Sequence, residues 1–485
     1  MTQAPRTPPN PTPLWTAEEA AAATGGRNTR DWSASGVAID SRTLKPGDLF
    51  VAIQGPNFDG HAFVADALAK GAAAAVVSRR PDGVAADAPL LMVDDPFAAL
   101  QDLGRAARTR TSARIVAVTG SVGKTSTKEA LRLILAAQGL TSASEGSLNN
   151  HWGVPLSLAR MPREARFGIF ELGMNHAGEI APLTKMVRPH VAVITTIEAV
   201  HLEFFDSVEG IAAAKAEIFD GLVEGGVAVL NQDNDYFGFL TRQALAKGVA
   251  RVVGFGVSPG AWARLVNYRQ VDGASQITAE VGGAPLTYRL GVVGRHQALN
   301  SLAVLAAVAQ LGGDVAAAAQ TLDQLTPPKG RGARHRVALG VTGGSFTLVD
   351  ESYNASPPAM RAAFAVLAAS EPGPGGRRIA VLGDMLELGP ESSVIHRNLA
   401  QDVVAAGINL VFTAGTDMAH LTAALPPALR GGHGTQAADL LPLLRETLRP
   451  GDVVVVKGSH GSRMGLIVEA LLAGAATTKT AANGN

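Results

Sequence analysis

"VAVTGSVGKTSTKEAL", Val116 to Leu131, joins an apolar run to a Gly-rich turn, a lysine, hydroxyl side chains and a helical pattern. Glycines allow successive backbone N–H groups to converge on a phosphate, and the start of a helix adds partial positive charge. Lys124 can reach the β- and γ-phosphates of a nucleotide, and the Thr125 hydroxyl can bind Mg²⁺. The stretch therefore predicts a phosphate-binding loop made of Gly120, Ser121, Val122, Gly123, Lys124, Thr125 and Ser126.

The spacing of this loop differs from the standard phosphate-loop pattern, because Val118 stands where the first glycine would be. The alternative is a tight turn between a strand and a helix that carries an incidental lysine. The apolar run before the turn and the helical pattern after it favour the phosphate-binding loop.

Composition excludes several classes of protein. The 485 residues suggest two to four domains. Lys+Arg and Asp+Glu both number 42, so no global field attracts nucleic acid or anionic lipid. The absence of cysteine excludes disulfides, thiolate metal sites and a cysteine nucleophile. The Pro-rich N-terminus does not resemble a secretory signal, and no apolar run approaches the roughly 18 residues of a membrane span. We expect a cytoplasmic protein with no nucleic-acid partner and no stable membrane insertion.

Strand and helix patterns alternate along the chain in three blocks. After the phosphate loop, "FGIFELG", "VAVITTI", "GVAVLN" and "RVVGFG" predict strands of a parallel sheet with helices on both faces. "QLTPPKGRG", residues 324–332, breaks the alternation and predicts a linker, with the hinge near residues 327–330. We expect an α/β fold of three domains: a small α/β domain (1–110), a central domain with a mostly parallel sheet (111–327) and a Rossmann-like doubly wound domain (328–485).

Three further side chains are candidates for metal chemistry. Glu171 ends an apolar strand, and a parallel sheet would place it beside the phosphate loop. His201 follows a strand that ends near Ile197. Lys215 has alanine neighbours in a predicted helix, where a buried lysine is costly unless paired or modified. The alternatives are a surface glutamate, a loop histidine with satisfied hydrogen bonds and a lysine that extends to solvent.

Eight segments occur in order and together resemble the Mur ligase family: "TGSVGKTSTKE", "SLNNHWGVPLSL", "ELGMNHAGEI", "IEAVHLEFFDSVEGIAAAKAEIF", "GRHQALNSLA", "DESYNASPPAM", "GDMLELG" and "VVVKGSHGSRM". The resemblance covers the chain from Asp40 to about Leu472. The phosphate loop is shared with folylpolyglutamate synthases and has little specificity. "DESYNASP" and "GDMLELG" are more specific to the branch that adds D-alanyl-D-alanine.

The resemblance implies a metal site for two Mg²⁺ ions, with ligands at Thr125, Glu171, His201 and Lys215. Lys215 aligns with a lysine that these ligases carry as a carbamate, which replaces a cation by an anionic group. By the same resemblance, the catalytic side chains are Lys124, Lys215 and His201.

The resemblance also implies contacts to ATP. Asn300, in "GRHQALNS", is similar to the residue that contacts adenine. His296 precedes it, and Gln297 replaces the usual Asn of that motif. Arg331 in the linker and Asp350 in the third domain would reach the nucleotide when the third domain closes.

Substrate contacts are implied in all three domains: Asp40, Ser41, Arg42, Asn149, Asn150, Asn354 and Asp384. The first three lie in a segment that resembles a cradle for the uridine nucleotide; the alternative is a solvated turn. The Asn149–Asn150 pair resembles the substrate-facing loop of the central domain. Asn354 and Asp384 would face the dipeptide, although Asn354 alone also fits a turn before Pro357.

The activity implied by the resemblance is an ATP-dependent amide-bond ligation in cytoplasmic peptidoglycan synthesis, carried out by a monomer. The partners would be UDP-N-acetylmuramoyl-tripeptide and D-alanyl-D-alanine, joined through an acyl phosphate. Three alternatives stay open: a related ligase with another amino acid, a kinase or nucleotide switch with a phosphate loop, and a binding module without activity. The third residue of the peptide, L-Lys or meso-diaminopimelate, is also open.

Overall fold

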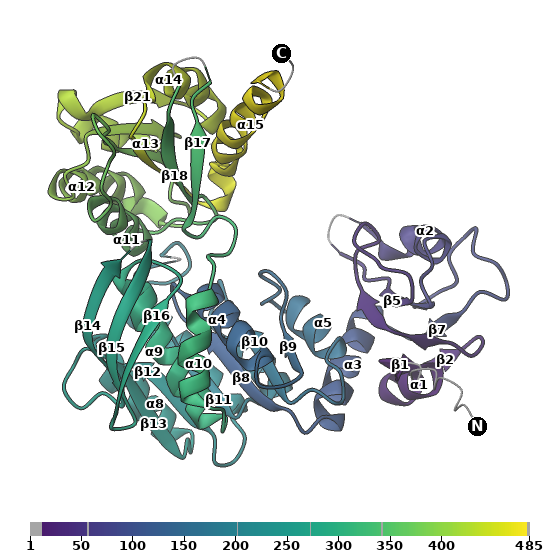
Figure 1. Ribbon diagram of the computed structural model, residues 1–485. Coiled ribbons are helices and arrows are strands. Elements are labelled where there is room, and N and C mark those ends of the chain that lie inside the picture. The colour runs from purple at the N-terminus through teal and green to yellow at the C-terminus, as the bar shows by residue number, and fades with distance from the viewer. Residues whose placement is uncertain (1–11, 56–57, 201, 272, 341–342, 483–485) are drawn as a thin grey trace, which may run out of the picture.

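A computed structural model describes residues 12–55, 58–200, 202–271, 273–340 and 343–482, with side chains described to residue 473. The chain forms a three-domain α/β structure, and in the described residues three larger sheets, of five, nine and six strands, follow one another along the sequence (Figure 1). Across these ranges, no helix is long and apolar enough to cross a membrane. The predicted fold class is confirmed.

The first sheet has five strands in the order β2-β7-β6-β5-β4. Strands β4 to β7 are parallel, and β2 pairs antiparallel with β7. A short antiparallel pair, β1 and β3, accompanies it. The elements are β1 (Trp15–Thr16), α1 (Ala17–Thr24), β2 (Arg27–Asn28), β3 (Ser33–Ala34), β4 (Gly36–Ala38), β5 (Asp48–Val51), η1 (Gly60–Phe63), α2 (Val64–Ala69), β6 (Ala74–Val77), β7 (Leu90–Met92) and α3 (Pro96–Arg110).

The central sheet has nine strands in the order β16-β15-β14-β13-β12-β11-β8-β10-β9. Its strands are β8 (Arg114–Thr119), β9 (Thr141–Ala143), β10 (Phe167–Glu171), β11 (Val191–Ile194), β12 (Val227–Asn231), β13 (Arg251–Gly256), β14 (Ala263–Val271), β15 (Ala274–Val281) and β16 (Ala284–Leu290). Its helices are α4 (Lys124–Ala136), α5 (Gly153–Ala159), α6 (Ile180–Val187), α7 (Val208–Ala216), η2 (Glu217–Gly221), α8 (Phe237–Ala246), α9 (Arg295–Gln310), α10 (Val315–Thr321) and η3 (Leu322–Gln324).

Strand β8 explains why the sequence before the phosphate loop is continuously apolar. Val116 and Val118 pack into a core with α4 and α9, whereas Ile115 and Ala117 pack into a second core with α5 and α6. Because both faces of the strand are covered, the four residues from Ile115 to Val118 are all apolar and fully buried. In the sheet, β8 lies between β11 and β10, so the phosphate loop at its carboxyl end has a strand end on either side.

The antiparallel strands β14, β15 and β16 were not expected from the sequence. In β15, Ile277, Ala279 and Val281 are buried while Gln276 and Glu280 are exposed. This two-residue period is typical of a strand with one covered face. The pair Gly282–Gly283, with φ of 61° and 84°, forms the two-residue turn to β16, which is a hairpin signal that sequence reasoning overlooked.

The third sheet has six strands in the order β17-β18-β22-β19-β20-β21, all parallel except the edge strand β17. Separate apolar cores cover its two faces, as in a doubly wound fold. The strands are β17 (Ala333–Ala338), β18 (Ser345–Glu351), β19 (Arg378–Gly383), β20 (Leu410–Ala414), β21 (Arg430–Gly434) and β22 (Val453–Lys457). The helices are α11 (Pro357–Ala368), η4 (Gly389–Glu391), α12 (Ser392–Ala405), α13 (Met418–Ala424), η5 (Pro427–Leu429), η6 (Ala437–Asp439), α14 (Leu440–Thr447), η7 (His460–Ser462) and α15 (Gly465–Ala482).

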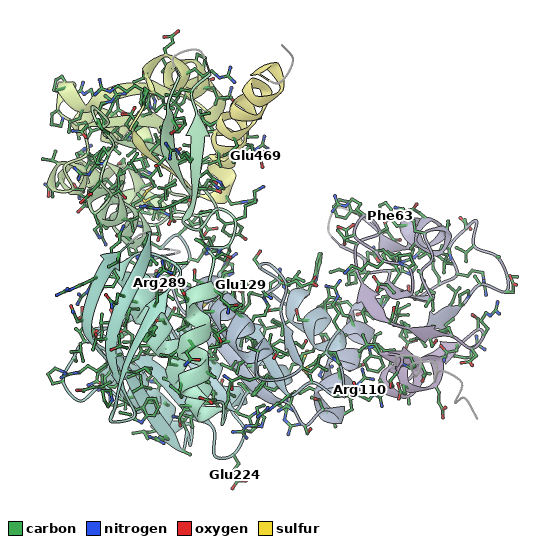
Figure 2. The ribbon with its side chains drawn as sticks, viewed as in Figure 1. Phe63, Arg110, Glu129, Glu224, Arg289 and Glu469 are labelled. Carbon is green, nitrogen blue, oxygen red and sulfur yellow. The ribbon has the colours of Figure 1, made fainter. Side chains whose placement is uncertain are left out.

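The first domain joins the central one through α3, which packs against α5. Arg110, labelled at this junction in Figure 2, lies with its guanidinium 3.8 Å from the centre of the Trp15 ring and donates to the Leu14 carbonyl. The third domain follows residues 325–332, which form neither helix nor strand, as the linker prediction requires. Two sequence-distant contacts add to this connection: Glu203 N donates to Glu387 O, and the Tyr353 hydroxyl donates to Ser147.

Candidate active site

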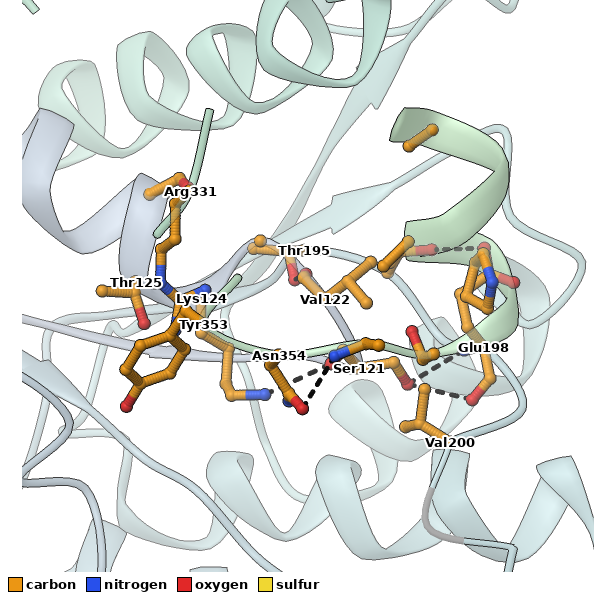
Figure 3. A pocket seen from close by; sticks show the side chains of 18 of the residues that line it. Ser121, Val122, Lys124, Thr125, Thr195, Glu198, Val200, Arg331, Tyr353 and Asn354 are labelled. Carbon is orange, nitrogen blue, oxygen red and sulfur yellow. Dashed lines mark hydrogen bonds between the residues drawn. The ribbon is translucent and has the colours of Figure 1, made fainter. Parts of the chain in front are cut away.

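A cavity of about 660 Å³ lies between the central and third domains. Its lining comes from the phosphate loop, the ends of β10 and β11, the start of α9, the linker and the loops after β18 and β22. Figure 3 shows Arg331 and Tyr353 on the side of Thr125, with Glu198 and Val200 at the opposite end. The volume is in the range that holds a nucleotide-sized ligand.

Two glycines shape the phosphate loop. Gly120 has φ of 143° and Gly123 has φ of 87°, conformations that residues with a Cβ atom rarely adopt. The Thr195 hydroxyl, at the end of β11, donates to the Val122 carbonyl at 2.5 Å. Helix α4 begins at Lys124, so unpaired N–H groups of its first turn lie at the cavity. Except for Gly120, which is buried behind them, the predicted loop residues line the cavity.

The Lys124 side chain folds back over the phosphate loop. Its Nζ donates to the Gly120 carbonyl at 2.6 Å and to the Ser121 carbonyl at 3.3 Å. Burial lowers the pKa of Lys124, the nearby Glu171 carboxylate raises it, and the Arg331 guanidinium lowers it. The Lys124 ammonium is therefore bound to the loop and lies within electrostatic reach of the Glu171 carboxylate and the Arg331 guanidinium.

Glu171 ends β10 and is 1% exposed. Its Oε1 accepts a hydrogen bond from Asn149 Nδ2 at 2.8 Å, and its backbone N–H donates to Ser144 Oγ at 3.1 Å. Its Oε2 is buried without a hydrogen-bond partner. A buried carboxylate oxygen with free lone pairs, in a cavity that Thr125 also lines, fits a divalent cation.

Within the described ranges, no group of three or more His, Asp or Glu side chains could hold a metal ion. His201, a predicted ligand, lies outside the described residues. A cation at Glu171 would therefore take further oxygens from the ligand, which is common for Mg²⁺ in phosphate sites.

Lys215 lies in α7, is 1% exposed and does not line the cavity. Burial lowers the pKa of Lys215 well below its usual value, and the positive charge of Lys124 lowers it further. Among the side chains that the structure describes, Lys215 forms no ion pair. Its surroundings therefore disfavour the charged ammonium relative to a lysine in water.

The start of α9 forms another wall of the cavity. Asn300 packs against the loop so closely that a Cβ atom on Gly123 would lie 2.9 Å from its Nδ2. His296 and Gln297 also line the cavity, and burial lowers the pKa of His296. The predicted adenine-contacting residue and the phosphate loop thus border the same space.

The linker and the third domain complete the lining. The Arg331 guanidinium lies 4.3 Å from the centre of the Tyr353 ring, and the Tyr353 hydroxyl donates to Ser147 Oγ at 2.8 Å. Asn354 lines the cavity, and its carbonyl accepts a hydrogen bond from Lys457 Nζ at 3.0 Å. Two domains therefore meet at the loop that carries Ser147.

Asp350 does not line this cavity. Its Oδ2 accepts a hydrogen bond from Gly330 N, and its Oδ1 accepts from both the N–H and the hydroxyl of Ser352. The carboxylate therefore ties the linker to the end of β18.

Other predicted substrate residues lie outside this cavity as well. Asp40 and Arg42 form an ion pair at 2.7 Å in the first domain, beside Ser41. Asn150 Oδ1 accepts hydrogen bonds at the start of α5, and Asp384 Oδ1 accepts one at the start of α13. In this arrangement of domains, Asn149 and Asn354 are the predicted substrate residues that line the cavity.

Three family models match successive parts of the chain: "Mur ligase family, catalytic domain" over residues 33–108, "Mur ligase middle domain" over 118–308 and "Mur ligase, glutamate ligase domain" over 335–460. The UDP-N-acetylmuramoyl-tripeptide–D-alanyl-D-alanine ligase of Escherichia coli (strain K12) is 36% identical over 446 residues, 91% of this chain and 94% of the relative. The ligase of the same name from Rickettsia prowazekii is 32% identical over 456 residues, 94% and 99% of the two chains. The chain belongs to the Mur ligase family.

Solved Mur ligase structures have the same fold. MurF from Acinetobacter baumannii has a TM-score of 0.82 and 29% identity, covering 95% of this chain and 99% of that one. The MurF ligase from Thermotoga maritima, in complex with ADP, has a TM-score of 0.75 and 27% identity, covering 90% and 97%. The resemblance inferred from the eight sequence segments is confirmed.

Sequence reasoning overlooked four polar side chains around the Mur ligase cavity: Lys128, Ser147, Tyr353 and Lys457. All four lie inside segments that carry the resemblance, so their position in the chain was a usable signal. Lys128 follows Lys124 by one helical turn, which places both lysines on one side of α4. The contact between Ser147 and Tyr353 depends on how two domains are oriented, and the contacts of Lys457 with Glu351 and Asn354 depend on how distant parts of the third domain pack.

Proposed function

We propose that this Mur ligase joins D-alanyl-D-alanine to UDP-N-acetylmuramoyl-tripeptide, using ATP, in the cytoplasmic stage of peptidoglycan synthesis. The cavity carries the proposal, because a phosphate loop, a buried carboxylate with a free oxygen and a wall from another domain surround one space. The names of relatives that align over nine-tenths of the chain support the substrates.

The chemistry explains why ATP is needed. A carboxylate is a poor acyl donor because its leaving group would be oxide. A terminal carboxylate oxygen of the tripeptide attacks the γ-phosphorus, the bond to the bridging oxygen breaks, and ADP leaves. The dipeptide amine then attacks the acyl carbon and loses a proton. Inorganic phosphate departs as the amide forms.

Two anions must meet in the first step, so the chain's own cationic groups matter. Lys124 and the first N–H groups of α4 lie where phosphate oxygens would bind, and they stabilise the negative charge in transfer. Thr125 and Glu171 would hold Mg²⁺, which supplies further positive charge to the phosphates when bound. Positioning of both reactants supplies much of the remaining rate increase.

Lys215 and His201 extend the proposal to a second Mg²⁺ ion. A carbamate forms when a neutral lysine amine adds to carbon dioxide, and burial lowers the pKa of Lys215, which makes the neutral amine easier to reach. Its proximity to Lys124 would favour the resulting negative charge. We assign Lys215 as the carbamate-bearing ligand and His201 as a ligand on the family resemblance.

Domain limits at 1–110, 111–327 and 328–485 belong to the same proposal. Each sheet lies within one of these ranges. Asp40, Ser41 and Arg42 in the first domain would bind the uridine nucleotide. Asn149, Asn150, Asn354 and Asp384 would bind the peptide substrates once the third domain closes, and Asp350 would approach ATP. Closure would also keep water from the acyl phosphate. We propose that the ligase acts as a monomer.

The test is phosphate release from ATP and Mg²⁺, with tripeptide substrates ending in L-Lys or meso-diaminopimelate, and with D-alanyl-D-alanine, supplied singly and together. Release that needs both, with a pentapeptide product by mass spectrometry, is expected. Release that ignores the dipeptide would refute the proposal. A requirement for a single amino acid would indicate another Mur ligase activity, and a stable phosphorylated product would indicate a kinase.

A further inference from the structure

Lys128 is a buried lysine for which the proposed chemistry has no role. It lies on α4, is 0% exposed and does not line the cavity. We propose that Lys128 is a positioning residue for the cation-binding carboxylate of Glu171. This inference rests on the proposed function, because it assumes that Glu171 binds a divalent cation together with the nucleotide.

Three oxygens surround the Lys128 ammonium. Its Nζ donates to the Gly146 carbonyl at 2.5 Å, and it lies 3.1 Å from Glu129 Oε1 and 3.8 Å from Glu171 Oε2. Glu129 is 21% exposed and pairs with Arg132 at 2.6 Å, so it has another cationic partner. An ion pair with Glu129 alone does not explain the burial of Lys128, because two charged side chains can pair at the surface without either of them being buried.

The distance to Glu171 indicates how Lys128 acts. At 3.8 Å, Nζ attracts Oε2 by charge but is too far for a hydrogen bond. Oε2 therefore stays free for a ligand from the cavity, as its lack of a hydrogen-bond partner shows. A direct hydrogen bond would occupy the lone pairs that a cation needs. The arrangement holds the carboxylate in place without blocking its free oxygen.

Lys128 also reaches Glu171 through the loop that follows β9. The Gly146 carbonyl, which accepts from Lys128, is three residues before Asn149. Asn149 Nδ2 donates to Glu171 Oε1 at 2.8 Å. One ammonium thus attracts one oxygen of the carboxylate and anchors the loop that fixes the other. Both effects would be lost together if a side chain with neither a charge nor a hydrogen-bond donor replaced Lys128.

The two lysines of α4 therefore have different roles. Lys124 lines the cavity and lies where the phosphates would bind, whereas Lys128, one turn later, lies behind Glu171. Outer-shell partners of this kind typically change metal affinity or activity by about 10- to 100-fold when they are removed.

The test measures Mn²⁺ binding in the presence of ADP by electron paramagnetic resonance, for the full-length protein and for Lys128→Met. We expect the Mn²⁺ dissociation constant to rise about 10- to 100-fold. ADP affinity without metal should change less than about twofold, because Lys128 does not line the cavity. The matched control is Arg132→Met, which removes a cation from the same helix and the same Glu129 and should leave Mn²⁺ affinity unchanged.

Lys128→Gln is the second variant if the methionine variant does not fold, because its amide can still donate to the Gly146 carbonyl without a charge. A folded variant with the Mn²⁺ affinity of the parent protein would overturn the inference, as would equal losses in Lys128→Met and Arg132→Met. The measurement needs neither tripeptide nor dipeptide. A failure of the proposed ligation would therefore appear in phosphate release and not in Mn²⁺ binding.

Discussion

Replacing Tyr353 with phenylalanine removes one hydroxyl group from the contact between the central and third domains. The hydroxyl donates to Ser147 Oγ at 2.8 Å, across 206 positions of sequence. The ring itself, which lies 4.3 Å from the Arg331 guanidinium, is retained. The substitution therefore isolates one hydrogen bond of the arrangement in which both domains line the cavity.

The size of the expected loss of activity follows from the strength of a neutral hydrogen bond. A neutral hydrogen bond contributes about 0.5–1.5 kcal/mol net. If the reaction requires this arrangement, kcat/KM for D-alanyl-D-alanine should fall by about 2- to 13-fold. Tyr353→Leu also removes the ring beneath Arg331, and an exposed cation–π contact of about 0.5–1 kcal/mol adds a further loss of about 2- to 5-fold.

Phosphate release under initial-rate conditions measures the effect, and Ser147→Ala completes a double-mutant cycle. Each single variant should lose a similar factor. The double variant should lose little more than either one, because both substitutions break the same bond.

Losses that multiply in the double variant would refute this reasoning, since they would mean that the two side chains act independently. Unchanged kcat/KM in Tyr353→Phe, with the leucine variant also unaffected, would mean that the reaction does not pass through this contact.

Three further predictions concern the phosphate loop, acid stability and the buried lysine. In Gly123→Ala, the left-handed backbone costs about 1–2 kcal/mol and the methyl group meets Asn300, so ADP affinity by calorimetry should fall at least about 10-fold; an unchanged affinity would contradict the loop geometry. Burial and neighbouring arginines lower the pKa of His190 from 6.5 to about 4, and its ring accepts a hydrogen bond from the Ile115 N–H. The contribution of neutral His190 to the free energy of unfolding should therefore be fully present above pH 6.5 and decline as the pH falls toward 4. In urea titrations, His190→Asn should show a smaller decline over this pH range, and an equal decline would reject the assignment. Lys215→Arg cannot form a carbamate, so phosphate release should fall by about 100-fold or more while circular dichroism stays unchanged, and retained activity would exclude the carbamate.

Local patterns carried much of the fold prediction. The strand before the phosphate loop and the strands β10, β11 and β12 were predicted because strands covered on both faces are continuously apolar. The antiparallel strands β14 to β16 were overlooked because half of their positions face solvent, which weakens the apolar signal.

The residues of the candidate site also fall into two groups, those that the local sequence specifies and those that depend on packing. Gly120 to Ser126 could be assigned from sequence because one strand, one turn and one helix form the loop within a few residues. The roles of Asp350 and Asp384 stay predictions from the resemblance, because the partner of a carboxylate depends on packing. In the structure, both accept hydrogen bonds from nearby backbone N–H groups, and neither lines the cavity.

By itself, the sequence determined the alternation of strands and helices in the parallel part of the central sheet, the phosphate loop and the family, because each depends on short-range chemistry or on motifs in a fixed order. The tertiary structure decided which distant side chains meet. It placed Tyr353 on Ser147, left one oxygen of Glu171 without a hydrogen bond, and set Lys128 behind that oxygen. Such contacts depend on how sheets, helices and domains pack, and a spacing along the chain does not specify them.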